Sequence, residues 1–159
     1  MAKDQTETFW TLVKSIRTCM LTAHNDGRLQ SRPMTAYAMP DENRIYFITR
    51  LDTEKTHALE DGQPVNLGFA HVGDNNYVSV EGTAQVVRDT ARQKQLWNLF
   101  AEAYMPEGPT ADTTGMIEVT PETATYWSGS SWTITELWKV AVANVLQQEP
   151  ETEQATVRL

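Results

Sequence analysis

The chain has 159 residues, 40% hydrophobic and 21% charged, which predicts one folded domain with a substantial core. Its formal net charge of −8 disfavours a binder of duplex nucleic acid or of anionic lipid, because either needs a basic face. No run approaches the roughly 20 apolar residues of a membrane-spanning helix, and the first ten residues do not resemble a secretory signal, so we expect a cytoplasmic protein.

The first part of the chain predicts a helix, a hairpin, a strand and a short second helix. Apolar residues recur at helical spacing over 5–17. The stretch 18–40 predicts a hairpin that turns at 25–27, where a glycine supplies positive φ. The apolar run 44–49 predicts a third strand, and 52–62 predicts a short helix with an aspartate as N-cap.

The second part predicts another hairpin, a helix and a sixth strand. The hairpin spans 64–89 and turns at a Gly-Asp-Asn sequence, and residues 90–104 carry an apolar stripe typical of a helix. The strand covers 116–127, and Pro121 within it suits an edge strand or a bulge.

Six short strands in hairpins, with helices between them, predict a mainly β, α+β protein built as a six-stranded antiparallel barrel. A parallel Rossmann sheet is disfavoured, because strands and helices do not alternate and no glycine-rich phosphate motif occurs. We place the domain at 1–146, ending in a last helix, and expect 147–159 to be a loose or disordered acidic tail.

The start of the short helix carries cations where they are not favoured. Lys55 lies in its first turn and Arg50 just before it, so both face the positive end of the helix dipole. One interpretation is that both are solvated and balanced by nearby carboxylates. The other is a phosphate held by the start of the helix, Lys55 and the hydroxyls of Thr49 and Thr56.

Two further features suit a ligand. Arg32, inside an apolar strand, either points outward to a carboxylate or reaches the same phosphate. Pro33 removes a ladder donor, which predicts an edge or irregular strand whose backbone groups are free to meet a ligand. Trp127 and Trp132 bracket a polar segment, either as core anchors or as walls for a flat aromatic molecule.

No acid–base catalyst or metal site stands out. The three histidines lack zinc-ligand spacing, and Ser79 lacks the glycine elbow of the hydrolases. Cys19 is the single cysteine, which excludes an intramolecular disulfide and indicates a small core residue.

Five stretches carry a resemblance by their order: "SRPM", "IYFITRLDTEKTHALE", "YVSVEGTAQVVRD", "QKQLWNLFAEAYMPEG" and "IEVTPETATYW". Together they resemble the general stress protein 26 group of the pyridoxamine 5'-phosphate oxidase-like flavoproteins, which share the FMN-binding split barrel. The likeness extends from about Phe9 to Trp138.

The resemblance implies a homodimer with two FMN molecules at the subunit interface. It implies that Arg32 and Lys55 hold the phosphate, helped by Thr56 and Arg50. The flavin and its ribityl chain would be lined by Pro33, Met34 and Thr35, together with Ile48 and Thr49. Trp127, with Trp132, would approach the ring from the other subunit.

The chain also departs from the family pattern. It lacks the basic C-terminal segment of true pyridoxamine phosphate oxidases, so that activity is disfavoured. Tyr104-Met105 replaces a Trp-Phe pair before Pro-Glu-Gly, and Ser128 replaces an aspartate after Tyr-Trp, both near the expected pocket rim.

Several functions stay open at this point. The first hypothesis is an FMN-binding flavoprotein that is redox-active, with a stress role implied by the resemblance alone. The alternatives are a non-catalytic flavin store or sensor, a split barrel that binds deazaflavin or heme, and a barrel dimer without a cofactor. The sequence also does not decide whether the flavin is FMN or FAD.

Overall fold

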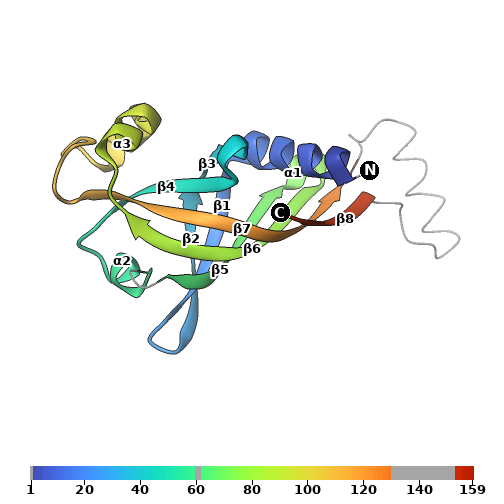
Figure 1. Ribbon diagram of the computed structural model, residues 1–159, viewed down its shortest axis with the longest axis horizontal. Coiled ribbons are helices and arrows are strands. Elements are labelled where there is room, and N and C mark those ends of the chain that lie inside the picture. Colours follow the sequence, from blue (N-terminus) through green and yellow to red (C-terminus); the bar gives the residue numbers. More distant parts are fainter. Residues whose placement is uncertain (1, 60–61, 130–152) are drawn as a thin grey trace, which may run out of the picture.

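The structure is a computed structural model that describes residues 2–59, 62–129 and 153–159 (Figure 1). The described residues form four α-helices, eight strands and two single-turn 3-10 helices. The helices are α1 (Ala2–Ile16), α2 (Glu54–Leu59), α3 (Thr90–Leu96) and α4 (Leu99–Tyr104), and the 3-10 turns are η1 (Pro40–Glu42) and η2 (Val72–Asp74). The strands are β1 (Thr18–Asn25), β2 (Arg28–Thr35), β3 (Tyr37–Met39), β4 (Arg44–Arg50), β5 (Gln63–His71), β6 (Asn76–Val87), β7 (Thr114–Ser128) and β8 (Glu153–Arg158).

The strands form one antiparallel sheet that curls into a split barrel. Their order is β2-β1-β5-β6-β7-β4-β3, with β8 added on β7. The two outermost strands of that order, β2 and β3, follow each other in the chain with Ala36 alone between them. The chain itself therefore connects the two ends of the sheet through Ala36. Among the described residues, no backbone hydrogen-bond ladder joins those two ends. The mainly β, antiparallel split-barrel prediction is confirmed, with eight described strands instead of six.

One of the two unpredicted strands arises from a break in the first hairpin. The N–H of Ala36 donates to the carbonyl of Arg17 at 2.7 Å, which stops β2 before β3 begins. Arg17 has φ of 65°, and its N–H donates to the carbonyl of Val13, so it ends α1 in the αL motif and turns the chain into β1.

The other unpredicted strand is β8. The expectation of a loose tail is wrong for Glu153–Arg158, which pairs with Thr123–Ser128 of β7. Ala155 and Val157 alternate inward and are buried, so this end of the chain contributes to the core. The predicted last helix, up to about residue 146, falls outside the described residues.

Pro121 lies in the middle of β7, which is a central strand. One edge of β7 pairs with β6, and its other edge pairs first with β4 and then with β8. Pro121 lies between those two partners, and the register with β6 shifts between Glu81 and Gly82. The edge-strand interpretation is therefore wrong, and the bulge is confirmed. Gly82 is required there, because a Cβ on it would lie 2.4 Å from the Thr120 carbonyl oxygen.

The predicted helix over 90–104 is broken into α3 and α4. Trp97 and Asn98 both have extended backbones, and the Asn98 side-chain oxygen accepts from the Ala101 N–H at 2.9 Å. This N-cap starts a second helix in a new direction. The predicted apolar stripe is divided by it: Leu96 is buried, whereas Leu99 and Phe100 are exposed.

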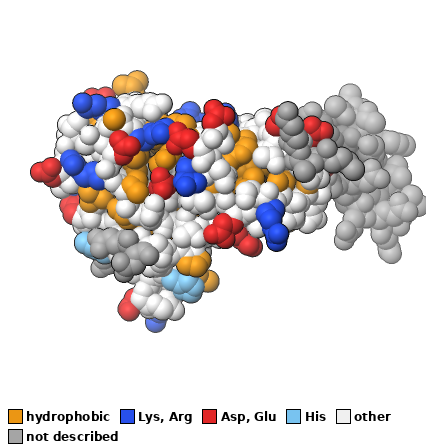
Figure 2. All heavy atoms as spheres, in the orientation of Figure 1, with side chains coloured by type: hydrophobic (Ala, Val, Ile, Leu, Met, Phe, Trp, Pro, Cys, Tyr) orange, Lys and Arg blue, Asp and Glu red, His pale blue; other side chains and the backbone are white. Residues whose placement is uncertain are grey.

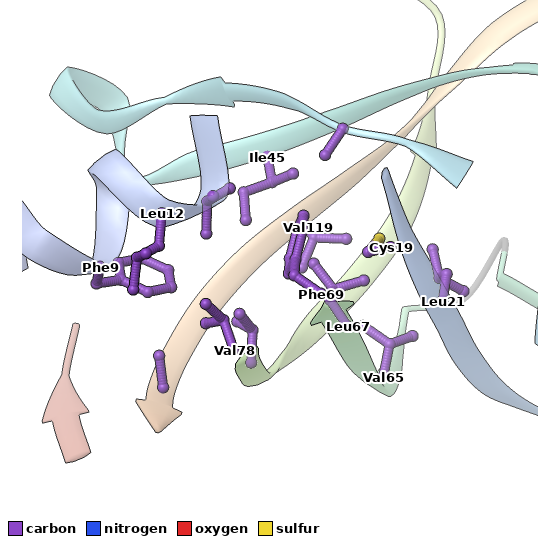
Figure 3. Packing of buried hydrophobic residues seen from close by; sticks show 14 of the residues in the cluster. Phe9, Leu12, Cys19, Leu21, Ile45, Val65, Leu67, Phe69, Val78 and Val119 are labelled. Carbon is purple, nitrogen blue, oxygen red and sulfur yellow. The ribbon is translucent and has the colours of Figure 1, made fainter. Parts of the chain in front are cut away.

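The core fills the barrel beneath α1. Figure 3 shows Phe9 and Leu12 of α1 in one cluster with strand residues such as Ile45, Val78 and Val119. The predicted alternation of β6 is confirmed, since Val78, Val80, Gly82 and Ala84 are buried. In the described part of the chain, no helix is long and apolar enough to span a membrane.

The buried thiol of Cys19 gives a test of this packing. Cys19 is 2% exposed, and burial raises its pKa to about 12. We expect its reaction with a disulfide reagent at pH 8 to be at least about 100-fold slower in the folded protein than in guanidinium chloride. Stopped-flow absorbance would measure both rates, and rapid stoichiometric labelling of the folded protein would contradict this core.

Candidate functional site

A pocket opens where β2 ends and β3 begins. Its volume is about 450 Å³, within the usual range for small-molecule sites. The walls come from the first residue of β1, the ends of β2 and β4, the start of β3, and α4. The lining residues are Thr18, Pro33, Met34, Thr35, Tyr37, Ile48, Thr49, Arg50, Phe100, Ala101, Tyr104 and Met105.

The structure brings two predicted segments together at this pocket. Residues 33–35 and 48–50 lie far apart in the sequence, yet all six line it. They meet because β3 pairs only with residues 44–46 of β4, so the end of β4 is left facing β2 across the split. The predicted edge position of Pro33 is confirmed, since β2 pairs with β1 alone among the described strands. One backbone edge of β2 is therefore available at the pocket.

Arg50 is the cation in the pocket lining, and it already has partners. Its Nη1 lies 2.9 Å from Glu107 Oε1, and its Nε lies 3.2 Å from Asp52 Oδ1. The hydrogen bond with Asp52 raises the pKa of Arg50 and lowers the pKa of Asp52. The interpretation in which Asp52 balances Arg50 is therefore confirmed, and the second carboxylate is Glu107 from a loop distant in the sequence.

The turn that follows Arg50 is held by two threonines. The helix α2 begins at Glu54, two residues later than predicted. The predicted N-cap is wrong, because Asp52 pairs with Arg50 and Thr53 accepts from the Thr56 N–H instead. Thr53 and Thr56 exchange hydrogen bonds between backbone N–H and side-chain oxygen, as in a capping box. The Thr56 hydroxyl also lies 2.8 Å from the Leu51 carbonyl and is buried. Thr56 therefore braces this turn from inside.

Of the other predicted residues, Arg32, Thr56 and Trp127 do not line the pocket in the single chain. Arg32 lies beside Pro33 in β2, half-buried, with Nη2 3.2 Å from the Gln30 side-chain oxygen. Lys55 lies in α2, but its side chain is outside the described part of the structure. Trp127 pairs with Tyr77 near the other end of β7, and Trp132 is outside the described residues.

Sequence reasoning missed part of the lining. Thr18 and Tyr37 were not singled out, and neither were Phe100 and Ala101. The departure of Tyr104-Met105 from the family pattern was the one available indication, and both residues do line the pocket. Phe100 and Tyr104 form an aromatic pair with ring centroids 5.1 Å apart.

Helix α3 is anchored to the sheet beside the pocket by a polar cluster. Arg92 lies 5.3 Å from the centre of the Tyr46 ring, and its Nη2 is 2.6 Å from Glu42 Oε1. The Tyr46 hydroxyl donates to Glu118 at 3.1 Å, and burial with this bond raises its pKa to about 12. Figure 2 shows basic and acidic side chains interleaved over this part of the sheet.

The loop that carries Glu107 is tied to the same helix. The buried Gln93 of α3 donates from Nε2 to the Pro109 carbonyl at 2.7 Å. The Thr114 hydroxyl donates to the Gly108 carbonyl at 2.9 Å. These bonds place Glu107 within reach of Arg50, so α3 and the loop position one rim of the pocket. Among the described residues, no group of three or more His, Cys, Asp or Glu is arranged to hold a metal ion.

Comparison with known proteins identifies relatives of this fold. The family model described as pyridoxamine 5'-phosphate oxidase like matches residues 4–151. No curated protein matches the chain.

Solved structures align over most of the chain. A protein provisionally described as general stress protein 26 from Jannaschia sp. CCS1 is 24% identical, with 99% of each chain covered and a TM-score of 0.82. The general stress FMN/FAD binding protein from Xanthomonas citri is 28% identical, with 83% of this chain and 94% of that chain covered and a TM-score of 0.73. The general stress protein 26 from Bacillus anthracis str. Sterne is 21% identical, with 77% and 92% covered and a TM-score of 0.67.

The contact between Gly115 and Leu51 at the pocket rim can be tested by mutation. A Cβ on Gly115 would clash with Cδ2 and Cγ of Leu51, so Gly115→Ala must displace the Leu51 side chain that packs against it. We expect it to lower the free energy of unfolding by about 1–3 kcal/mol. Adding Leu51→Ala makes room for the new methyl group. The double variant should therefore lose less free energy of unfolding than the two single variants lose together. Additive costs in guanidinium denaturation would contradict this contact.

Proposed function

The chain belongs to the pyridoxamine 5'-phosphate oxidase-like family, and on that premise we propose that it binds FMN in the pocket between β2, β4 and α4 and is redox-active. The observation that carries the proposal is the convergence of residues 33–35 and 48–50 on one pocket. The description of the Xanthomonas citri relative as an FMN/FAD binding protein supports the choice of a flavin.

The residues present fit a flavin. The apolar side chains of Met34, Ile48 and Met105 offer flat contact surface for an isoalloxazine ring. The hydroxyls of Thr18 and Thr35, with the free edge of β2, offer donors and acceptors for the polar rim of the ring and the ribityl chain. The pocket therefore combines an apolar slot with a small number of polar groups.

The phosphate would lie at the end of the pocket that Arg50 lines. We assign it to Arg32 and Lys55, with Arg50 beside them. Arg50 is shared with Asp52 and Glu107, so its net contribution to an incoming dianion is reduced. Thr56 contributes through the turn it braces, because its hydroxyl and its N–H already bond within that turn.

The chemistry would come from the cofactor. A bound flavin accepts and donates electrons or hydride, while the protein sets access and orientation. No Asp, Glu, His, Lys or Cys lines the pocket in the described structure, so Tyr37 and Tyr104 would be the lining groups able to exchange a proton. A non-catalytic flavin store or sensor has the same lining. Reduction of the bound flavin by NADH or NADPH, followed by turnover on an acceptor, separates the two. A general stress role rests on the descriptions of the relatives.

We further propose that the protein is a homodimer. Leu99, Phe100 and Tyr104 are 85%, 56% and 71% exposed on the single chain, and all three lie on α4. A second copy that covers this helix would remove the exposed apolar surface and close the pocket against water. In that assembly Trp127 and Trp132 of the partner would approach the ring.

The phosphate assignment is tested by comparing FMN with riboflavin. We expect FMN to bind much more tightly than riboflavin, because each charge-assisted bond to phosphate contributes roughly 1.5–3 kcal/mol. The double variant Arg32→Ala/Lys55→Ala should lose most of that difference and leave riboflavin binding nearly unchanged. Flavin fluorescence titration measures both affinities.

The matched control removes two exposed cations elsewhere, in Lys14→Ala/Arg28→Ala. It should keep wild-type FMN affinity. If the double variant also binds FMN like wild type, the phosphate is held by other residues.

The dimer is tested by mass in solution. The chain is 17.9 kDa, so light scattering at micromolar concentration should give a mass of twice that value. Leu99→Glu should shift the protein toward monomer, because it places a charge in the proposed contact. Val72→Glu is the control, since Val72 is similarly exposed but lies on η2. A monomeric mass for the wild-type protein would contradict a flavin site between subunits.

A further inference from the structure

A second pocket adjoins the first at the split of the barrel. Its volume is about 560 Å³, and its lining is Ile16, Arg17, Thr18, Thr35, Asn98, Leu99 and Phe100. Thr18, Thr35 and Phe100 line both pockets, so the two spaces share one wall. Arg17, Asn98 and Leu99 line the second pocket and not the first.

Arg17 is an unusual residue for its backbone position. The αL residue that ends a helix is usually glycine, because a side chain is disfavoured at φ of 65°. Arg17 therefore places a long cationic side chain at a position where glycine would be less strained. Arg17 is exposed and takes part in none of the ion pairs found within residues 2–59, 62–129 and 153–159. Its guanidinium is therefore available at the pocket.

Asn98 supplies further donors beside Arg17. Its Oδ1 is taken by the Ala101 N–H at 2.9 Å, which fixes the amide plane by making it the cap of α4. The Nδ2 group has no partner among the described residues and keeps both of its N–H donors. A guanidinium and a fixed amide N–H on one pocket match the acceptor oxygens of a carboxylate.

The rest of the lining is apolar. Leu99 and Phe100 project from the first turn of α4, and Ile16 comes from the last residue of α1. Phe100 is paired with Tyr104, which leaves an aromatic surface at the shared wall. This combination suits a molecule with one anionic group and a flat apolar body.

We propose that this second pocket binds a small aromatic carboxylate, with the carboxylate on Arg17 and Asn98 and the ring against Leu99 and Phe100. The site goes beyond the flavin proposal and does not depend on it, because its charged and capping residues lie outside the first pocket. Leu99 and Phe100 also belong to the surface proposed for the dimer, so the ligand and the partner subunit would share this wall. If a flavin occupies the first pocket, the ring of this ligand would lie next to it across Thr18, Thr35 and Phe100.

The test uses benzoate as the probe, and benzyl alcohol as a neutral molecule of similar shape. Each is titrated into the isotope-labelled full chain, with and without FMN, and followed by two-dimensional NMR. Benzoate should shift the Asn98 side-chain amide and the backbone amides around Arg17 and Leu99 saturably. Benzyl alcohol should bind at least about 10-fold more weakly, since it cannot form charge-assisted bonds.

Three variants separate the site from general charge effects. Arg17→Asn removes the charge with a residue that tolerates positive φ, and should weaken benzoate at least about 10-fold. Asn98→Asp keeps the cap oxygen but replaces the donor with a like charge, and should weaken benzoate at least as much. Lys14→Gln removes an exposed cation one turn earlier in α1 and should leave benzoate affinity unchanged.

These experiments test the carboxylate site independently of whether a flavin binds. Site-specific shifts that are lost in Arg17→Asn and Asn98→Asp, but kept in Lys14→Gln, support the site. Absence of saturable shifts at these amides overturns it, as does equal weakening by Lys14→Gln. If FMN does not bind while benzoate does, the flavin proposal fails and this site stands.

Discussion

The hydrogen bond from the Ala36 N–H to the Arg17 carbonyl is the interaction on which the site depends. It stops β2 at Thr35, and the next residues begin β3 at the opposite end of the strand order. Without that break the hairpin would continue and the barrel would have no split. The same bond holds the junction of α1 and β1, at Arg17, against the junction of β2 and β3, at Ala36. One backbone contact therefore sets the helix end, the split and the place of both pockets.

The pockets are completed by a helix that contributes little to the core. Asn98 breaks the predicted helix and aims α4 across the split, where its apolar side chains remain exposed. The anchors lie on the neighbouring α3, through Gln93 and Arg92. Helix α4 is therefore held in place through α3, while its own apolar side chains remain exposed to solvent. Such an exposed wall is suited to closure by a second subunit, which is why the dimer and the flavin site are proposed together.

Charge around the site is balanced before any ligand arrives. Arg50 spans Asp52 and Glu107, and so it joins the turn after β4 to the loop before β7. A phosphate must compete with these carboxylates for Arg50, whereas Arg17 faces no such competition among the described residues. The two arginines therefore differ in function: Arg50 organises the rim of the first pocket, and Arg17 is poised to bind.

The sequence by itself determined the local features of this protein. Apolar periodicity located α1 and the hairpins, and Pro33, Thr35, Ile48 and Thr49 were identified as pocket residues through the resemblance to the family. Tertiary structure decided what depended on distant contacts. The break at Ala36 and the strand β8 each need a partner from elsewhere in the chain, so no local pattern marks them. The division between α3 and α4 depends on the local cap at Asn98, which the continuous apolar stripe over 90–104 concealed. Dependence on distant contacts also hid Thr18, Tyr37 and Phe100, because ordinary residues line a pocket only where the fold brings their elements together.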